Sequence, residues 1–280
     1  MNKFIKAVTS LNFEQTKQLL GSQPKWRTWF RPDGKNALHF LCGTPVVSKW
    51  NVPADELKPP DPAKAERSLA ILKLLVKAGL DVNSIHRIPD RNCGHFPATP
   101  VWYAYTRGRN EKLYKWLLHN GGCPDHCLFA IAWYDDVKAA ELFKKFGALG
   151  AITGAKSSPP YEGGVAAASA DGVVLSDARD PAMRTLESAV RKLSECLLAA
   201  LFWKKFKIAE WLLKNGADPD ITDPQGRTPL LYLVKKKYPA EPIRLLIRYG
   251  ADPDRENPKG ESARKVASSY RDKSFSKLLN

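Results

Sequence analysis

Apolar residues recur along the chain in short groups, and each group ends at a glycine followed by a polar turn. Residues 212–220 read LLKNGADPD, and residues 246–254 read LIRYGADPD, which is the same pattern shifted by 34 residues. Weaker copies begin at Leu75, Leu117 and Leu142. A glycine after an apolar stretch favours the left-handed cap of a helix, and the following Asp and Pro favour a turn. The pattern predicts several helices that end in the same way.

A second pattern marks where other helices begin. Thr99-Pro100 and Thr228-Pro229 each stand 22 residues before one of the glycines, Gly121 and Gly250. A Thr can cap a helix and a Pro is favoured in its first turn, so each pair predicts the start of a helix of about two turns. Two helices therefore fit into each repeated unit.

These residues resemble the ankyrin repeat, whose consensus runs G-x-T-P-L-H-x-A-A, a short tip, a second helix and then G-A-D-x-N. The best matches are residues 226–230, which read GRTPL, and the two GADPD turns, while Asn36-Ala37-Leu38-His39 places His39 in the histidine position. The resemblance implies an all-α ankyrin-repeat solenoid of about seven helix-turn-helix repeats, folded as a single domain over residues 1–280. Degenerate repeats are expected at both ends, over residues 1–32 and 255–280.

Two insertions interrupt the repeats. Residues 43–66, rich in Pro, enlarge the tip between the two helices of the second repeat, which begins at Asp33. Residues 150–185 are dominated by small residues without an apolar period, which predicts a mobile loop before a repeat that starts near Glu187. This second insertion is interpreted as a passive linker or, alternatively, as a segment that folds on a partner or lies in the protein's own groove.

Charge narrows the class of partner. The 280 residues include 44 Lys and Arg against 29 Asp and Glu, a formal net charge of +15. This balance favours acidic proteins, nucleic acid or anionic lipid as partners. Five cysteines favour a reducing compartment over a disulfide framework, and Lys6 interrupts the apolar stretch that a signal peptide needs, so a cytoplasmic location without a membrane span is expected.

Motifs for catalysis are not found in the sequence. It has no Gly-rich phosphate loop and no Gly-x-Ser-x-Gly elbow, so we expect no enzyme, no catalytic residues and no cofactor. Cys123 and Cys127, with Cys93 and His95 one repeat earlier, fall within the spacing of zinc ligands. Counting in phase with the repeats instead places Cys42, Cys127 and Cys196 in core positions, which favours structural cysteines and no metal site.

Candidate binding residues follow from the repeat register. In an ankyrin stack the two residues before the tip of the first helix line the concave groove, and here they are Thr106-Arg107, Ala132-Trp133, Leu201-Phe202 and Lys235-Lys236. We predict an exposed apolar patch of Trp133, Leu201 and Phe202, which would anchor a protein partner. Arg107, Lys235 and Lys236 would attract an acidic surface, with the loops between repeats contributing further contacts. The alternative is that the 150–185 segment or an adjacent helix covers the patch.

Basic residues also recur at the tips. Arg109, Lys204, Lys205, Lys207 and Lys237 would form a basic ridge along one edge, interrupted at Asp135 and Asp136. A solvated face is the simplest reading of such lysines, but nearby aromatic residues could stack on bases. The sequence therefore predicts a protein–protein interaction module, with binding of nucleic acid or anionic lipid along this ridge as the alternative.

Overall fold

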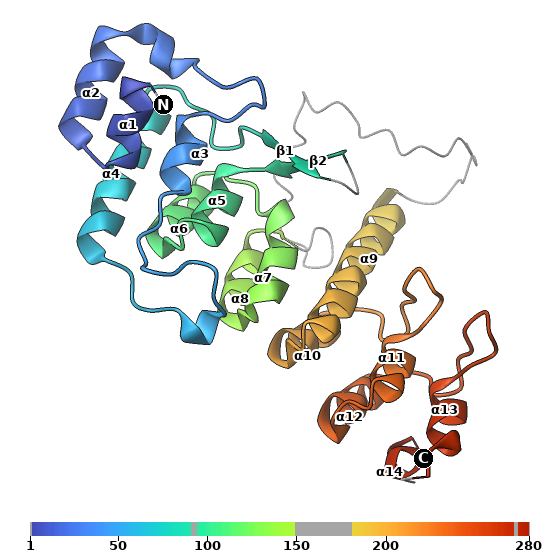
Figure 1. The fold of residues 1–280 in the computed structure, drawn as a ribbon. Coiled ribbons are helices and arrows are strands. Elements are labelled where there is room, and N and C mark those ends of the chain that lie inside the picture. The colour runs from blue at the N-terminus through green and yellow to red at the C-terminus, as the bar shows by residue number, and fades with distance from the viewer. Residues whose placement is uncertain (1, 91–93, 149–180, 272–273, 280) are drawn as a thin grey trace. The chain divides into compact units, whose positions relative to one another are not determined.

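The computed structural model describes residues 2–90, 94–148, 181–271 and 274–279, and for residues 181–186 it describes the helix without the side chains. Over these residues the chain forms fourteen α-helices arranged in sequence as seven pairs, together with one β-hairpin (Figure 1). It divides into two compact units. Unit 1 comprises residues 1–130 and 142–148, and unit 2 comprises residues 131–141 and 149–280.

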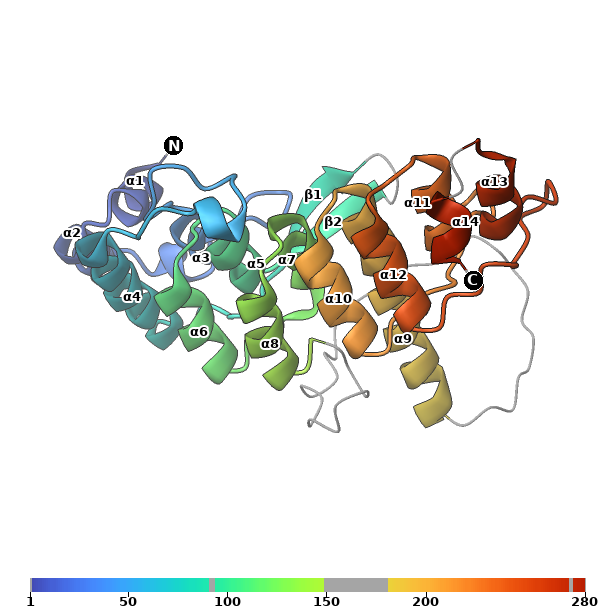
Figure 2. The ribbon, with the colours of Figure 1, turned by 90° about the horizontal axis from the view of Figure 1, so that it is seen from below.

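Unit 1 contains three complete helix pairs. They are α1 (Lys3–Thr9) with α2 (Phe13–Ser22), α3 (Ala37–Cys42) with α4 (Pro62–Lys77), and α5 (Pro100–Thr106) with α6 (Glu111–His119). Most begin at a capping side chain; the Asn36 carboxamide, for example, accepts hydrogen bonds from the Leu38 and His39 amides. The second helices α4 and α6 lie side by side (Figure 2). Short 3-10 turns occupy Pro24–Arg27, Ala54–Glu56 and Asp125–Cys127.

A β-hairpin separates the second and third pairs. Strand β1 (His86–Asp90) pairs antiparallel with β2 (Gly94–Ala98), with His86 opposite Ala98. The hairpin adds to the predicted all-helical repeats, and sequence analysis did not identify it. Its first residue, His86, is buried.

The first insertion has a small core of its own. Val46, Val47 and Ala65 are buried together, with Trp50 and Leu57 packed against them. The predicted insertion ended at residue 66, but α4 begins at Pro62 because the Asp61 carboxylate caps it by accepting from the Lys64 amide at 3.0 Å. The connection between α3 and α4 therefore spans residues 43–61.

Unit 2 contains α9 (Pro181–Phe202) with α10 (Phe206–Lys214), α11 (Pro229–Lys235) with α12 (Ala240–Arg248), and α13 (Ala263–Ser269) with α14 (Ser274–Leu278). Figure 2 shows α10 and α12 side by side. The remaining pair, α7 (Leu128–Tyr134) and α8 (Val137–Lys145), is divided between the units. Of the predicted loop 150–185, residues 150–180 lie outside the described residues, while 181–185 are helical, so the prediction extended the loop into the first turns of α9.

The repeat-specific predictions for helix ends and cysteines are confirmed. Gly121, Gly216 and Gly250 have φ of 83°, 92° and 88°, the left-handed conformation expected of the cap. Cys42, Cys127 and Cys196 are fully buried. Among the helices of the described residues, none is long and apolar enough to cross a membrane.

Candidate functional site

The tips between paired helices align the repeats residue by residue. Arg109 takes a positive φ of 46° at the tip after α5, where the Asn110 amide donates to the Ala104 carbonyl, six residues earlier. At four other tips one residue also takes a positive φ, and these residues are Leu11 (56°), Asp135 (54°), Lys204 (58°) and Lys237 (52°). In each of these four cases the amide of the next residue donates to the carbonyl five residues earlier, through the pairs Asn12–Ala7, Asp136–Ile131, Lys205–Ala200 and Tyr238–Leu233. Because the geometry is the same, positions counted back from these tips are equivalent.

Only one of the two predicted groove positions faces solvent. Three residues before the tip stand Val8, Ala132, Leu201 and Val234, which are all buried. The prediction that Leu201 is exposed is therefore wrong, since its side chain is 1% exposed. Two residues before the tip, Trp133 and Phe202 are 44% and 63% exposed. Successive residues of a helix point about 100° apart, so one faces the core while its neighbour faces outward.

The predicted groove pair of the sixth repeat, Lys235-Lys236, lies one residue too far toward the C-terminus. Lys237, like Lys204, is the tip residue, so Lys235 is the equivalent of Phe202. Its ammonium lies 2.7 and 2.8 Å from the two carboxylate oxygens of Glu261. The hydrogen bond from Lys235 lowers the pKa of the Glu261 carboxyl. The charge of Lys235 is thus matched within the chain, whereas Lys236 is exposed.

Trp133 and Phe202 each lie against a second aromatic ring. The ring of Trp133 meets that of Trp203 edge to face, with centroids 4.9 Å apart, and Phe202 lies 6.1 Å from Tyr232. Trp203 and Tyr232 are themselves half-buried. We call Trp133, Phe202, Trp203 and Tyr232 the aromatic row; all four belong to unit 2.

Hydrogen bonds fix the backbone that carries the aromatic row. The Asp135 carboxylate accepts from the Ile208 amide at 2.8 Å, which ties the tip after α7 to the start of α10. The Glu141 carboxylate accepts from the Trp211 indole at 2.6 Å, which ties α8 to α10. The exposed rings are therefore presented by a frame that is ordered without a partner.

The predicted basic ridge is only partly exposed. Arg109 is 6% exposed and its guanidinium lies 5.4 Å from the ring centre of Tyr105, so the prediction that it is a surface residue is wrong. Lys204 and Lys237 are exposed, but their ammonium groups lie over Tyr238 and Tyr270, at 5.6 and 5.0 Å from the ring centres. Lys207 is exposed and Lys205 is half-buried.

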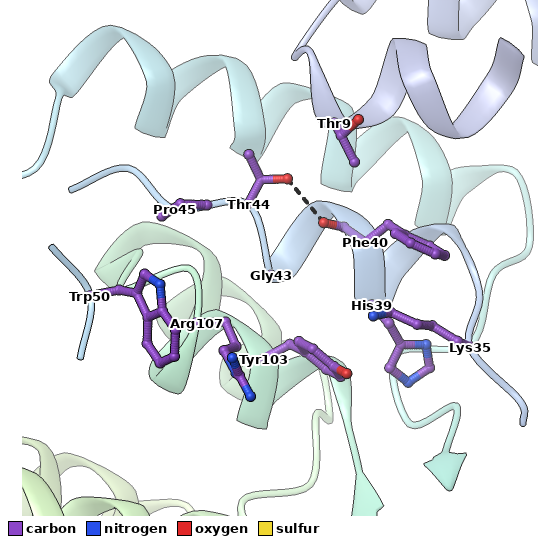
Figure 3. A pocket seen from close by; sticks show the side chains of 10 residues that line it. All are labelled: Thr9, Lys35, His39, Phe40, Gly43, Thr44, Pro45, Trp50, Tyr103 and Arg107. Carbon is purple, nitrogen blue, oxygen red and sulfur yellow. Dashed lines mark hydrogen bonds between the residues drawn. The ribbon is translucent and has the colours of Figure 1, made fainter. Parts of the chain in front are cut away.

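Arg107 lies in unit 1, where it lines a pocket of about 540 Å³ (Figure 3). Its guanidinium lies 4.5 Å from the ring centre of Trp50. Lys35 lines the same pocket, with its ammonium 4.6 and 5.0 Å from the ring centres of Phe40 and Tyr103. Lys35, Trp50 and Tyr103 were not predicted as site residues, because no periodic pattern in the sequence connects a loop, an insertion and a helix.

A chain of polar contacts runs from Tyr103 away from the pocket. The Tyr103 hydroxyl and Nδ1 of His86 are 2.7 Å apart, and Nε2 of His86 is 3.3 Å from the Asp33 carboxylate. Asp33 in turn pairs with Arg31 at 3.1 Å. Burial lowers the pKa of His86 and raises that of Tyr103. A neutral His86 therefore joins the two groups and holds the Tyr103 ring in place.

The histidines and cysteines do not form a metal centre in the described part of the chain, where no group of three or more His, Cys, Asp or Glu is placed to hold an ion. Cys127 lies in the core, Cys123 is half-buried, and Cys93 falls outside the described residues. His39 is buried in its predicted repeat position, with Nε2 3.0 Å from the Ser84 carbonyl and Nδ1 2.8 Å from Asn36. Its contacts join the two ends of the second repeat.

Comparisons with known proteins agree with this architecture. The family described as ankyrin repeats (3 copies) matches residues 197–280. Among solved structures, the ankyrin repeat domain of human ASB11 matches with a TM-score of 0.51 and 15% identity, over 100% of this chain and 96% of that one. The ankyrin repeat domain of Bcl-3, a member of the IkappaB protein family, matches with a TM-score of 0.55 and 15% identity, over 100% of this chain and 98% of that one.

No curated protein matches the chain. At 15% identity, the structural likenesses concern the fold. The family match over residues 197–280 and the paired helices of the described chain agree with each other and with the GADPD turns. The described chain therefore has the ankyrin-repeat fold, and its residues 197–280 match the ankyrin-repeat family.

Proposed function

We propose that this protein binds a protein partner through the aromatic row of unit 2. Ankyrin repeat domains generally mediate protein–protein interaction and generally act as non-enzymatic adaptors. One observation carries the choice of surface: Trp133 and Phe202 occupy equivalent positions in successive repeats and are both exposed. Large aromatic side chains that face solvent together are typical of a binding surface.

The energetics of association favour these two side chains as anchors. Aromatic residues dominate binding energy at interfaces because they bury a large apolar area while immobilising few torsions. Trp133 is already in edge contact with Trp203, and the ring of Phe202 lies tilted beside that of Tyr232, so little side-chain freedom is lost when a partner covers them.

Charge near the aromatic row supports an acidic partner. Lys204, Lys236 and Lys237 are exposed around the two tips that follow α9 and α11. Lys235 contributes less than the sequence suggested, because Glu261 already neutralises it. Exposed lysines increase the rate of association with an acidic surface, and this effect weakens with salt.

The test compares the proteins that the unaltered chain captures with those that matched variants capture. Trp133→Ala and Phe202→Ala should each weaken binding of a specific partner by about 1–3 kcal/mol, chiefly through faster dissociation. Phe30→Ala is the control, because Phe30 is 66% exposed but lies in unit 1, outside the aromatic row. Quantitative mass spectrometry of captured proteins identifies the partner, and its affinity is then measured with purified components. Equal retention by all three variants would refute the proposed surface.

The second candidate function is binding of nucleic acid or anionic lipid along the ridge of Lys204, Lys205, Lys207 and Lys237. Its support is weaker than the sequence suggested, because Arg109 is buried and two of these lysines lie over tyrosine rings. Charge reversal of Lys204, Lys205 and Lys207 distinguishes the two functions. It should slow association with a partner held by the aromatic row without abolishing binding, because the rings still anchor that partner. It should abolish phosphate-dominated binding, which also falls steeply with salt.

A further inference from the structure

The pocket of unit 1 combines positive charge with aromatic walls. It has a volume of about 540 Å³ and is formed by the end of α1, by α3 and the segment that follows it, and by the end of α5. In Figure 3 the ring of Tyr103 lies between the side chains of Arg107 and Lys35. The volume lies in the range of small-molecule and side-chain binding sites.

Neither cation of this pocket has a salt-bridge partner among the described residues. Arg107 and Lys35 are held over aromatic rings. The carboxylate of Asp33, whose charge acts on Lys35, already contacts Arg31, His86 and the Lys35 amide. Burial, together with Arg31 and Arg107, lowers the pKa of Lys35, although the charge of Asp33 acts in the opposite direction. An anion in the pocket would offset the repulsion that Arg31 and Arg107 exert on the Lys35 ammonium.

The other groups of the pocket are suited to positioning and add no charge. His39 lines the pocket, but burial lowers its pKa to about 4, so it is neutral near pH 7. Tyr103 is held through His86 and Asp33. Trp50 comes from the first insertion, and its ring lies against the Arg107 guanidinium. Both cations therefore lie against aromatic rings of the pocket without a ligand.

We propose that this pocket binds the carboxylate of an acidic peptide segment, with Arg107 and Lys35 as the groups that contact it. A guanidinium can bind a carboxylate through two parallel hydrogen bonds, and an ammonium adds a further donor. The aromatic walls formed by Trp50, Phe40 and Tyr103 accommodate the aliphatic part of the acidic side chain. This site belongs to unit 1 and does not depend on the aromatic row of unit 2.

The experiment measures fluorescence anisotropy of a labelled decapeptide of alternating Glu and Ser, added to the full-length protein at 0.15 M salt. A peptide with Gln in place of Glu is the uncharged control. Arg107→Gln and Lys35→Gln should each weaken binding of the Glu peptide by about tenfold or more, since hydrogen bonds to charged groups are among the strong ones. Lys49→Gln removes the same charge from an exposed lysine that does not line the pocket, and it should change affinity less than twofold.

Several results would overturn the proposal. They are absence of binding by the unaltered protein up to 1 mM peptide, equal binding of the Gln peptide, and equal weakening by Lys49→Gln and Arg107→Gln. If inorganic phosphate displaces the labelled peptide as effectively as unlabelled peptide does, the pocket binds a free anion instead. Circular dichroism checks that the variants fold, and Arg107→Gln is the safer of the two because Arg107 is exposed. Trp133→Ala should leave this binding unchanged, which separates failure of this site from failure of the aromatic row.

Discussion

The neighbours Leu201 and Phe202 at the end of α9 provide a direct test of the repeat register. Leu201 is 1% exposed, and replacing it with Ala removes the equivalent of three buried methylene-sized groups, about 2 kcal/mol of transfer free energy. The cavity left behind raises the expected loss of unfolding free energy to about 2–5 kcal/mol. Phe202 is 63% exposed, so only about a third of its possible burial is realised. Phe202→Ala should therefore cost about 0.5–1 kcal/mol.

The assay is urea denaturation of both variants, followed by circular dichroism at 222 nm, with the unaltered protein measured in parallel. The expected result is a clearly lower midpoint for Leu201→Ala and a nearly unchanged midpoint for Phe202→Ala. Partner binding is then measured without urea, at a temperature at which both variants are folded. There Phe202→Ala should lower the affinity more than Leu201→Ala. Equal destabilisation, or a larger loss for Phe202→Ala, would show that the tip alignment is wrong by one residue and would remove the basis for the aromatic row.

Two further predictions concern buried titratable groups. Because the folded-state pKa of His39 is about 4 against an ordinary value of 6.5, the folded state binds fewer protons between these values, and stability should rise by roughly 3 kcal/mol from pH 4 to 6.5. Denaturation at a series of pH values should show this rise, and His39→Gln should flatten it; an unchanged slope would contradict the assignment. Cys42 and Cys196 are buried, which raises the pKa of both thiols, that of Cys196 to about 12, and Cys127 is equally buried. Native alkylation followed by mass spectrometry should therefore modify half-buried Cys123 before Cys42, Cys127 and Cys196, and rapid modification of Cys42 would be inconsistent with the fold.

The local features of the fold were accessible from sequence because they are decided by a few neighbouring residues. A glycine such as Gly216 after an apolar stretch, or a pair such as Thr228-Pro229, favours one backbone conformation wherever it stands. The 34-residue spacing of the GADPD turns then places the helices in pairs, and the structure confirms both features. The buried cysteines followed from the same spacing, since a core position recurs with the repeat.

The candidate site was accessible only in part, because it depends on the register at each tip and on contacts between distant residues. The aromatic pair Trp133 and Phe202 was predicted from its position, whereas Leu201 was misplaced because one residue changes the direction of a helical side chain by about 100°. The sixth repeat reaches its tip at Lys237, and only the backbone conformation there identifies Lys235 as the groove residue.

What the sequence by itself determined is the repeat: its period, its caps, its core cysteines and the basic balance of the chain. The tertiary structure decided which charged side chains are available to a binding partner. It pairs Lys235 with Glu261, 26 residues later, and buries Arg109 beside Tyr105. It also brings Trp50 of an insertion over Arg107 at the end of α5. Spacing within a repeat contains no information about such partners, because their proximity follows from the stacking of helices and from the path of an aperiodic insertion.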